Sequence, residues 1–224
     1  MLERRRSLRR TSPLVSYHEA MAPYDVTTAL IVVDVQNDFA DPAGSLYVRG
    51  GEDVVPVANE HIEAALQGGA RVLYTQDWHP PSTPHFVTDG GIWPVHCVAE
   101  TWGADLHPDL LIRGPVVRKG SNGEDGYSGF TMRDPQTGET RATDLADRLR
   151  EAGIQMLVVC GLATDYCVKA TALDARGLGW STILLAAGTR AVDLEPGDGE
   201  RALDEMRAAG VVVEEDPDAT RLAP

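Results

Sequence analysis

The sequence predicts an α/β fold: a three-layer αβα sandwich around a mostly parallel, Rossmann-like sheet of about six strands. Six short apolar runs rich in β-branched residues alternate along the chain with segments of helical periodicity. This alternation is typical of βαβ units, whose strands are buried on both faces. Glycines follow the helical segments at the position where helices commonly end. A chain of 224 residues suffices for one such domain with a substantial core.

The elements follow one another in a regular order. The expected strands are the apolar runs 29–33, 72–75, 116–118, 156–160, 182–185 and 211–213. The expected helices are 54–67, 143–152, 165–176 and 199–209, each followed by glycine: Gly68-Gly69, Gly153, Gly177 and Gly210. Two long irregular segments, 77–109 and 120–142, each follow a strand, and 130–141 has the pattern of a small hairpin. Loops of this length in a compact domain are usually functional or disordered.

Charge and cysteine content limit the partners and the compartment. The net charge of −14 disfavours nucleic acid and anionic membranes as partners. No apolar run reaches the roughly 18 residues of a transmembrane helix. The basic residues 1–22 lack the apolar region of a signal peptide, so a disordered extension is expected there, with a single domain over 23–224. Three cysteines without a framework spacing indicate a reducing, cytoplasmic setting.

Cys167 is the candidate nucleophile. It follows the apolar run 157–160 and Gly161, at the beginning of a helical segment. Unpaired N–H groups and the positive end of the helix dipole favour a thiolate there, and open α/β sheets place their chemistry at this edge. The alternative for any one cysteine is a small buried hydrophobic side chain, which suits Cys160 within the strand.

Two charged residues end other predicted strands. Asp34 follows the first strand, where a carboxylate is costly unless it is solvated, paired or used, and a loop cap is the equal alternative. Lys119 ends the third strand, where a solvated edge residue is the default. Beside a cysteine and an aspartate, Lys119 would instead lower the thiol pKa.

The segment after the second strand has a composition suited to metal binding. Asp77, His79, His85 and His96 supply one carboxylate and three imidazoles within a short irregular region. A divalent metal accepts such N/O donors, and the Asp-x-His pair can bring two of them to one ion. Scattered surface histidines are the alternative. Zinc, iron and manganese all suit the set, with zinc expected first.

Together these motifs resemble the nicotinamidases (pyrazinamidases) of the isochorismatase-like cysteine hydrolase superfamily. The matching segments are DVQNDF, DWHPPSTPHF, WPVHC, Lys119-Gly120, YSGF and GLATDYCVKATALDA, which occur in the family's order between residues 29 and 175. Two features depart from the family pattern. Glu100 stands where members commonly have glycine, and the interval from Lys119 to Tyr127 differs by a residue from some relatives.

The resemblance implies a role for each matching residue. Cys167 would be the nucleophile, Asp34 the acid/base and Lys119 the third member of the catalytic site. The implied metal ligands are Asp77, His79 and His96, and His85 lies where some members supply a further histidine near the metal.

Further roles concern the substrate. A cis peptide at Leu162-Ala163 would turn the Ala163 N–H toward the substrate oxygen. The Ala163 and Cys167 N–H groups would then form an oxyanion hole together. Phe39 and Trp93 match the aromatic residues that sandwich a pyridine ring, and Leu162 and Tyr127 would complete the substrate site.

The implied activity is metal-dependent hydrolysis of nicotinamide to nicotinate and ammonia through a thioester, a step of NAD salvage. Two alternatives stay open: an amidohydrolase acting on N-carbamoyl or ureido compounds, and a non-catalytic metal-binding module. The expected partner is a small molecule, and homo-oligomer formation is left open.

Overall fold

The structure, a computed structural model, describes residues 24–215. The expectation of a disordered extension over residues 1–22 lies outside the described residues. No described helix has both the length and the apolar character needed to cross a membrane.

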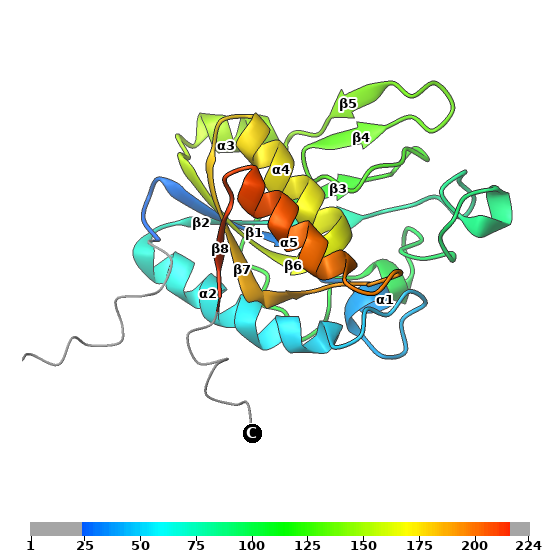
Figure 1. The fold of residues 1–224 in the computed structure, drawn as a ribbon, viewed down its shortest axis with the longest axis horizontal. Helices are drawn as coiled ribbons and strands as arrows, with labels where there is room; N and C mark the ends of the chain where they lie inside the picture. Colours follow the sequence, from blue (N-terminus) through cyan, green and yellow to red (C-terminus); the bar gives the residue numbers. More distant parts are fainter. Residues whose placement is uncertain (1–23, 216–224) are drawn as a thin grey trace, which may run out of the picture.

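A six-stranded, fully parallel sheet forms the centre of the molecule, as predicted (Figure 1). Its order is β3-β2-β1-β6-β7-β8, with every neighbouring pair parallel. The strands are β1 Thr28–Val33, β2 Arg71–Asp77, β3 Val116–Lys119, β6 Met156–Leu162, β7 Ser181–Arg190 and β8 Val212–Glu214. The predicted positions are confirmed, and β7 is longer than expected.

Helices cover both faces of the sheet and make the three layers (Figure 1). The long helix α2, Val54–Gly68, packs on one face, and α3, Leu145–Glu151, α4, Lys169–Gly177, and α5, Asp198–Ala208, pack on the other. The short elements are α1, Asn37–Ala40, and three 3-10 turns at Gly51–Asp53, Val87–Asp89 and Trp102–Ala104.

Alternation along β1 explains why both layers form. Leu30 and Val32 pack in the cluster that contains α2, whereas Ala29, Ile31 and Val33 pack in the cluster that contains α3, α4 and α5. Successive side chains of a strand point to opposite faces, so a strand with apolar side chains on both faces requires cover on both sides. All six residues of β1 are buried.

Two local predictions had different outcomes. The hairpin is confirmed, with β4, Thr131–Arg133, paired antiparallel to β5, Thr140–Ala142, apart from the main sheet. The predictions that Gly68 and Gly177 lie just past their helices are wrong, because α2 includes Gly68 and α4 includes Gly177. The chain turns instead at Gly69 and Gly179, whose φ values are +78° and +101°. The Leu178 N–H still bonds to the Asp174 carbonyl, which carries the helical path beyond Gly177.

The strand order locates the place where a site is expected. β1 is paired with β2 on one side and with β6 on the other, so the chain order reverses between β1 and β6. Open α/β sheets bind ligands at the carboxyl ends of the strands at such a point. Asp34 and Asp77, Lys119 and Cys167 all lie at this edge of the sheet.

Candidate active site

Lys119 is the centre of a buried group at the carboxyl ends of β1, β2, β3 and β6. Its Nζ lies 2.9 Å from Asp34 Oδ2 and 3.6 Å from Cys167 Sγ, and it also forms an ion pair with Asp77 Oδ1. The strand register explains why Lys119 contacts Asp77, because the two residues are paired in the adjacent strands β3 and β2. The structure therefore brings the three predicted catalytic residues together, with Asp77 as a fourth member.

Burial and the lysine charge together determine the protonation of this group. Burial raises the pKa of the Cys167 thiol well above its ordinary value, and the nearby Lys119 ammonium only partly opposes it. Burial alone would lower the pKa of Lys119, but Asp34 and Asp77 outweigh it and hold that pKa well above its ordinary value. The lysine is thus a fixed positive charge between two carboxyl groups.

The two carboxyl groups are shifted in opposite directions. Burial raises the pKa of Asp34, and Lys119 offsets it only in part. Burial would also raise the pKa of Asp77, but Lys119 and His79 together lower it below the ordinary value. Asp77 is therefore the permanent anion, whereas Asp34 has the raised pKa of a group that takes up and returns a proton.

Asp34 is held from both its backbone and its side chain. Its φ is +48°, in the left-handed region that residues other than glycine seldom adopt. Its Oδ1 accepts a 2.6 Å hydrogen bond from Thr75 Oγ1 of β2. Thr75 was not singled out from the sequence, because a threonine inside a strand pattern is ordinary there. The hydroxyl leaves Oδ2 directed at Lys119.

A cluster of three histidines lies beside this group. His79, His85 and His96 are buried, and one ring nitrogen from each lies within 4.8 Å of the others. His79 Nε2 is 3.8 Å from Asp77 Oδ2, which adds the carboxylate. Asp77, predicted together with His79 and His96, is thus adjacent to His79, and His85 joins the two predicted histidines in the cluster.

The hydrogen bonds of the histidines leave donor atoms for a metal ion. His96 Nδ1 lies 2.7 Å from the Pro94 carbonyl, and His85 Nδ1 lies 2.9 Å from Asp125 Oδ1. Neither ring nitrogen of the buried His79 has a hydrogen-bond partner among the described residues. Buried polar atoms without partners are costly, so three imidazoles and a carboxylate fit a divalent cation well.

Gly120 allows His79 to occupy this position. Its φ is +80°, and a Cβ placed there would lie 2.6 Å from His79 Nδ1. A larger residue would therefore displace the imidazole. The Lys119-Gly120 pair thus supplies the charge and makes room for the His79 imidazole.

An aromatic pocket of about 30 Å³ opens onto Cys167. Phe39 forms one wall, with its ring 5.4 Å from that of His96. Trp93 donates a 3.0 Å hydrogen bond from Nε1 to the Tyr127 hydroxyl, which joins two predicted substrate residues. The described residues that line the pocket are Phe39, Leu46, Val48, Asp77, His85, Trp93, His96, Tyr127, Ala163, Tyr166, Cys167 and Val192.

Leu162 lies differently from the expectation for a substrate residue. Its side chain is fully buried in the cluster with α2, and it is not among the described residues that line the pocket. The Leu162-Ala163 peptide is cis, as expected, and a π-helical turn, Thr164–Val168, carries Cys167. In this turn the Tyr166 and Val168 N–H groups donate to the Ala163 carbonyl. The first N–H groups of a helix otherwise lack intrahelical partners, which favours an oxyanion beside Cys167.

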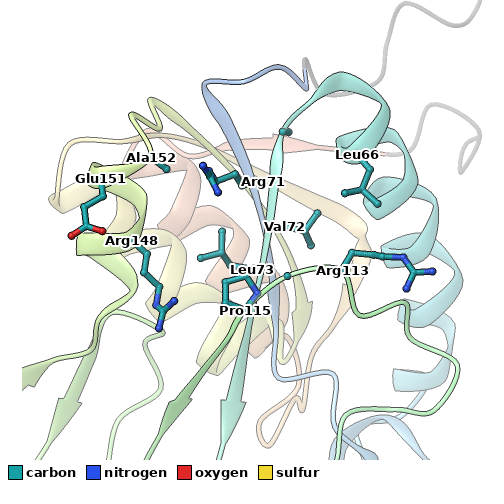
Figure 2. A pocket seen from close by; sticks show the side chains of 11 residues that line it. Leu66, Arg71, Val72, Leu73, Arg113, Pro115, Arg148, Glu151 and Ala152 are labelled. Carbon is teal, nitrogen blue, oxygen red and sulfur yellow. The ribbon is translucent and has the colours of Figure 1, made fainter.

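A larger hollow at the opposite edge of the sheet lacks such convergence. It has a volume of about 530 Å³ and is lined in part by Arg71, Arg113 and Arg148. Figure 2 shows the three guanidinium groups pointing in different directions. Arg148 is already paired with Asp144 at 2.7 Å. The buried, convergent charged side chains lie instead at the carboxyl edge.

Several pocket residues escaped the sequence analysis. Tyr166, Leu46 and Val192 come from three separate segments and have no motif among themselves. Asp125 contacts His85 and lies two residues before Tyr127. Its position in a segment rich in glycine and acidic residues offered no signal for this contact.

Comparison with known proteins gives concordant matches. The family model described as isochorismatase domain matches residues 28–216. The nicotinamidase of Escherichia coli (strain K12) is 39% identical over 203 residues, covering 83% of this chain and 93% of the relative.

Two solved structures resemble this chain over most of its length. The pyrazinamidase of Pyrococcus horikoshii in complex with zinc has a TM-score of 0.75 and 39% identity, and covers 85% of this chain and 99% of its own. PnC1 from L. infantum in complex with nicotinate has a TM-score of 0.76 and 38% identity, covering 87% and 96% of the two chains.

Proposed function

The chain belongs to the isochorismatase family, and on this premise we propose that it hydrolyses nicotinamide to nicotinate and ammonia through a thioester. The observation that carries the proposal is the single pocket into which Cys167, Asp77 and two of the three histidines open, with Asp34 and Lys119 directly behind it. A nucleophile alone would suit many amides. A donor set for a metal in the same aromatic pocket favours a flat heteroaromatic amide.

Acylation begins with the Cys167 thiol. Asp34 accepts its proton, and Cys167 Sγ attacks the carboxamide carbon. The Ala163 and Cys167 N–H groups hold the oxyanion that develops on the carbonyl oxygen. Asp34 then returns the proton to the amide nitrogen, the C–N bond breaks, and ammonia leaves a thioester on Cys167.

In deacylation Asp34 again acts first as a base and then as an acid. Asp34 accepts a proton from water while the water oxygen attacks the thioester carbon. The C–S bond breaks, the nicotinate carboxylic group forms, and the proton returns from Asp34 to the Cys167 sulfur. Lys119 stays charged throughout, so it stabilises the ionised states of both Asp34 and Cys167.

The proposed cofactor is one divalent metal ion, zinc first, with iron or manganese as alternatives. Asp77, His79 and His96 would hold it together with His85. When bound, the ion supplies a Lewis-acidic contact for the pyridine nitrogen and so selects the ring position of the amide. Phe39, Trp93 and Tyr127 would enclose the ring.

The relatives support the substrate. A nicotinamidase and a nicotinate complex are both similar to this chain over more than four fifths of its length. The zinc complex of a pyrazinamidase supports the metal. Three buried free cysteines, Cys97, Cys160 and Cys167, support the proposal of a reducing, cytoplasmic setting.

Ammonia release from nicotinamide by the purified protein tests the proposal. We expect release that falls after chelator treatment and returns on addition of Zn²⁺, Fe²⁺ or Mn²⁺, the best of which identifies the metal. Absence of release by metal-loaded protein would contradict the substrate. N-carbamoyl compounds would then be tested, because the Asp34, Lys119 and Cys167 group suits them as well.

A further inference from the structure

Asp125 lies outside both the catalytic group and the set of metal donors, yet it contacts one of the histidines. We propose that Asp125 is a positioning residue for His85: its carboxylate accepts the Nδ1–H of His85 and thereby presents Nε2 to the metal. The inference rests on the proposed function, because it assumes that a metal occupies the histidine cluster.

The contact determines which nitrogen of His85 remains available. His85 Nδ1 lies 2.9 Å from Asp125 Oδ1, and the side chains of His85 and Asp125 are 7% and 31% exposed. A carboxylate accepts but does not donate, so Nδ1 carries the hydrogen and Nε2 carries the lone pair. His85 packs against both other ligands, at ring distances of 4.9 Å from His79 and 5.3 Å from His96.

Asp125 is itself held firmly by the hairpin. Its N–H donates a 2.6 Å hydrogen bond to the Arg133 carbonyl of β4, and its carbonyl accepts the Arg133 N–H in return. The Gly126 N–H donates to Asp125 Oδ1 at 2.8 Å. The β4–β5 hairpin, which adds no strand to the main sheet, thus positions this carboxylate through its backbone.

Of the three histidines, His85 has the charged hydrogen-bond partner. His96 Nδ1 is paired with a neutral carbonyl, that of Pro94, and His79 has no hydrogen-bond partner among residues 24–215. A carboxylate partner makes a histidine a stronger ligand than a carbonyl does, and losing such a partner typically costs 10- to 100-fold in metal affinity. Asp125 therefore sets the metal affinity of the site through His85.

The test measures zinc affinity by competition with a chromogenic chelator, for protein stripped of metal and then reloaded. We expect Asp125→Ala to weaken Zn²⁺ binding at least about tenfold. Asp125→Asn should lose less, because its amide oxygen still accepts the Nδ1–H without the charge. Glu139→Gln, which removes an exposed carboxylate from the same hairpin away from His85, should bind Zn²⁺ as the wild type does.

A double-mutant cycle with His85→Ala separates positioning from general charge. If Asp125 acts through His85, Asp125→Ala should cause no further loss of affinity in the His85→Ala background. The absorption spectrum of Co²⁺-loaded protein should also change in Asp125→Ala, because the ligand geometry changes. Circular dichroism and the melting temperature check that each variant is folded.

Three results would overturn the inference. Wild-type affinity in folded Asp125→Ala would remove the role while leaving the proposed function intact. An equal loss in both backgrounds would mean that Asp125 acts by its charge and not by positioning His85. Absence of tight Zn²⁺ binding by the wild-type chain would contradict the metal site itself, and the inference with it.

Discussion

At the scale of residues, the site is a balance of charges around one buried lysine. Lys119 is 1% exposed and serves two carboxyl groups and a thiol at once. A buried ammonium is tolerated only with such partners, and its neighbours are in turn shifted by it. Asp34 is left as the group with the raised pKa, and Cys167 as a neutral thiol that reacts only when a base accepts its proton.

Replacing the thiol tests the nucleophile. Cys167→Ala should reduce kcat for nicotinamide by at least about 10³-fold, because the thioester route is closed. Cys160→Ala, at a buried cysteine in the middle of β6, should retain activity. Metal content and circular dichroism of both variants should match the wild type. Retained turnover in Cys167→Ala would remove it from the role of nucleophile.

The raised pKa of Asp34 predicts the acidic side of the pH profile. Asp34 accepts a proton only when ionised, so kcat/KM should fall as the pH drops through its pKa. Because burial raises that pKa above the ordinary 3.8, the fall should begin above pH 3.8. Steady-state rates at each pH, with metal content measured in parallel, check this. An acidic limb at or below pH 3.8 in metal-loaded protein would contradict it.

The backbone conformation at Glu100 explains why glycine is common at this position in the family. Its φ is +64°, in the left-handed region that glycine adopts at little cost. Glu100→Gly should therefore raise the free energy of unfolding by about 1 kcal/mol, measured by denaturant titration. Glu63→Gly, within helix α2, should lower it by a similar amount. A destabilised Glu100→Gly would show that the glutamate side chain makes a favourable contact.

At the scale of elements, the close approach of β6 to β1 allows the site to form. Gly161 pairs with Val33 at the end of the two strands, one residue before Asp34, with a φ of +122°. A Cβ at Gly161 would lie 2.0 Å from the Val33 carbonyl oxygen. Only glycine permits this spacing, so Gly161 determines how closely the strand that leads to Asp34 approaches the strand that leads to Cys167.

Gly161→Ala should be destabilising and inactivating together. The added methyl group must push β1 and β6 apart, at a cost of about 3 kcal/mol. Activity should fall more than the folded fraction does, because Asp34 and Cys167 would separate. Gly153→Ala, where the left-handed φ is +69° but the added Cβ meets no neighbouring atom, should cost less and keep its activity. A fully active, stable Gly161→Ala would refute this account.

At the scale of the whole molecule, the topology brings distant segments to one edge. Residues 34, 77, 119 and 167 come from four different strand ends, and the order β3-β2-β1-β6 makes those ends neighbours. The two hydrophobic clusters on the faces of the sheet run from Tyr24 to Val213. The single domain expected over 23–224 is proposed on this basis.

Removal of residues 1–20 tests that domain boundary. The described residues, 24–215, form both clusters and the candidate site, so we expect kcat/KM to be unchanged and the melting temperature to shift by no more than about 2 °C. Differential scanning calorimetry and the ammonia assay on the shortened and full chains provide the comparison. A large loss of either quantity would mean that the segment belongs to the folded domain.

The sequence alone determined the layers, the strands and most of the residues at the site, because apolar periodicity and strand-end position are local properties. Contacts between segments that are far apart in the chain could be seen only in the tertiary structure. The hydrogen bond of Thr75 to Asp34, the contact of Asp125 with His85 and the burial of Leu162 in the core depend on which strands and loops become neighbours. Register and topology decide those contacts, and a linear pattern of residues does not encode distances between segments far apart in the chain.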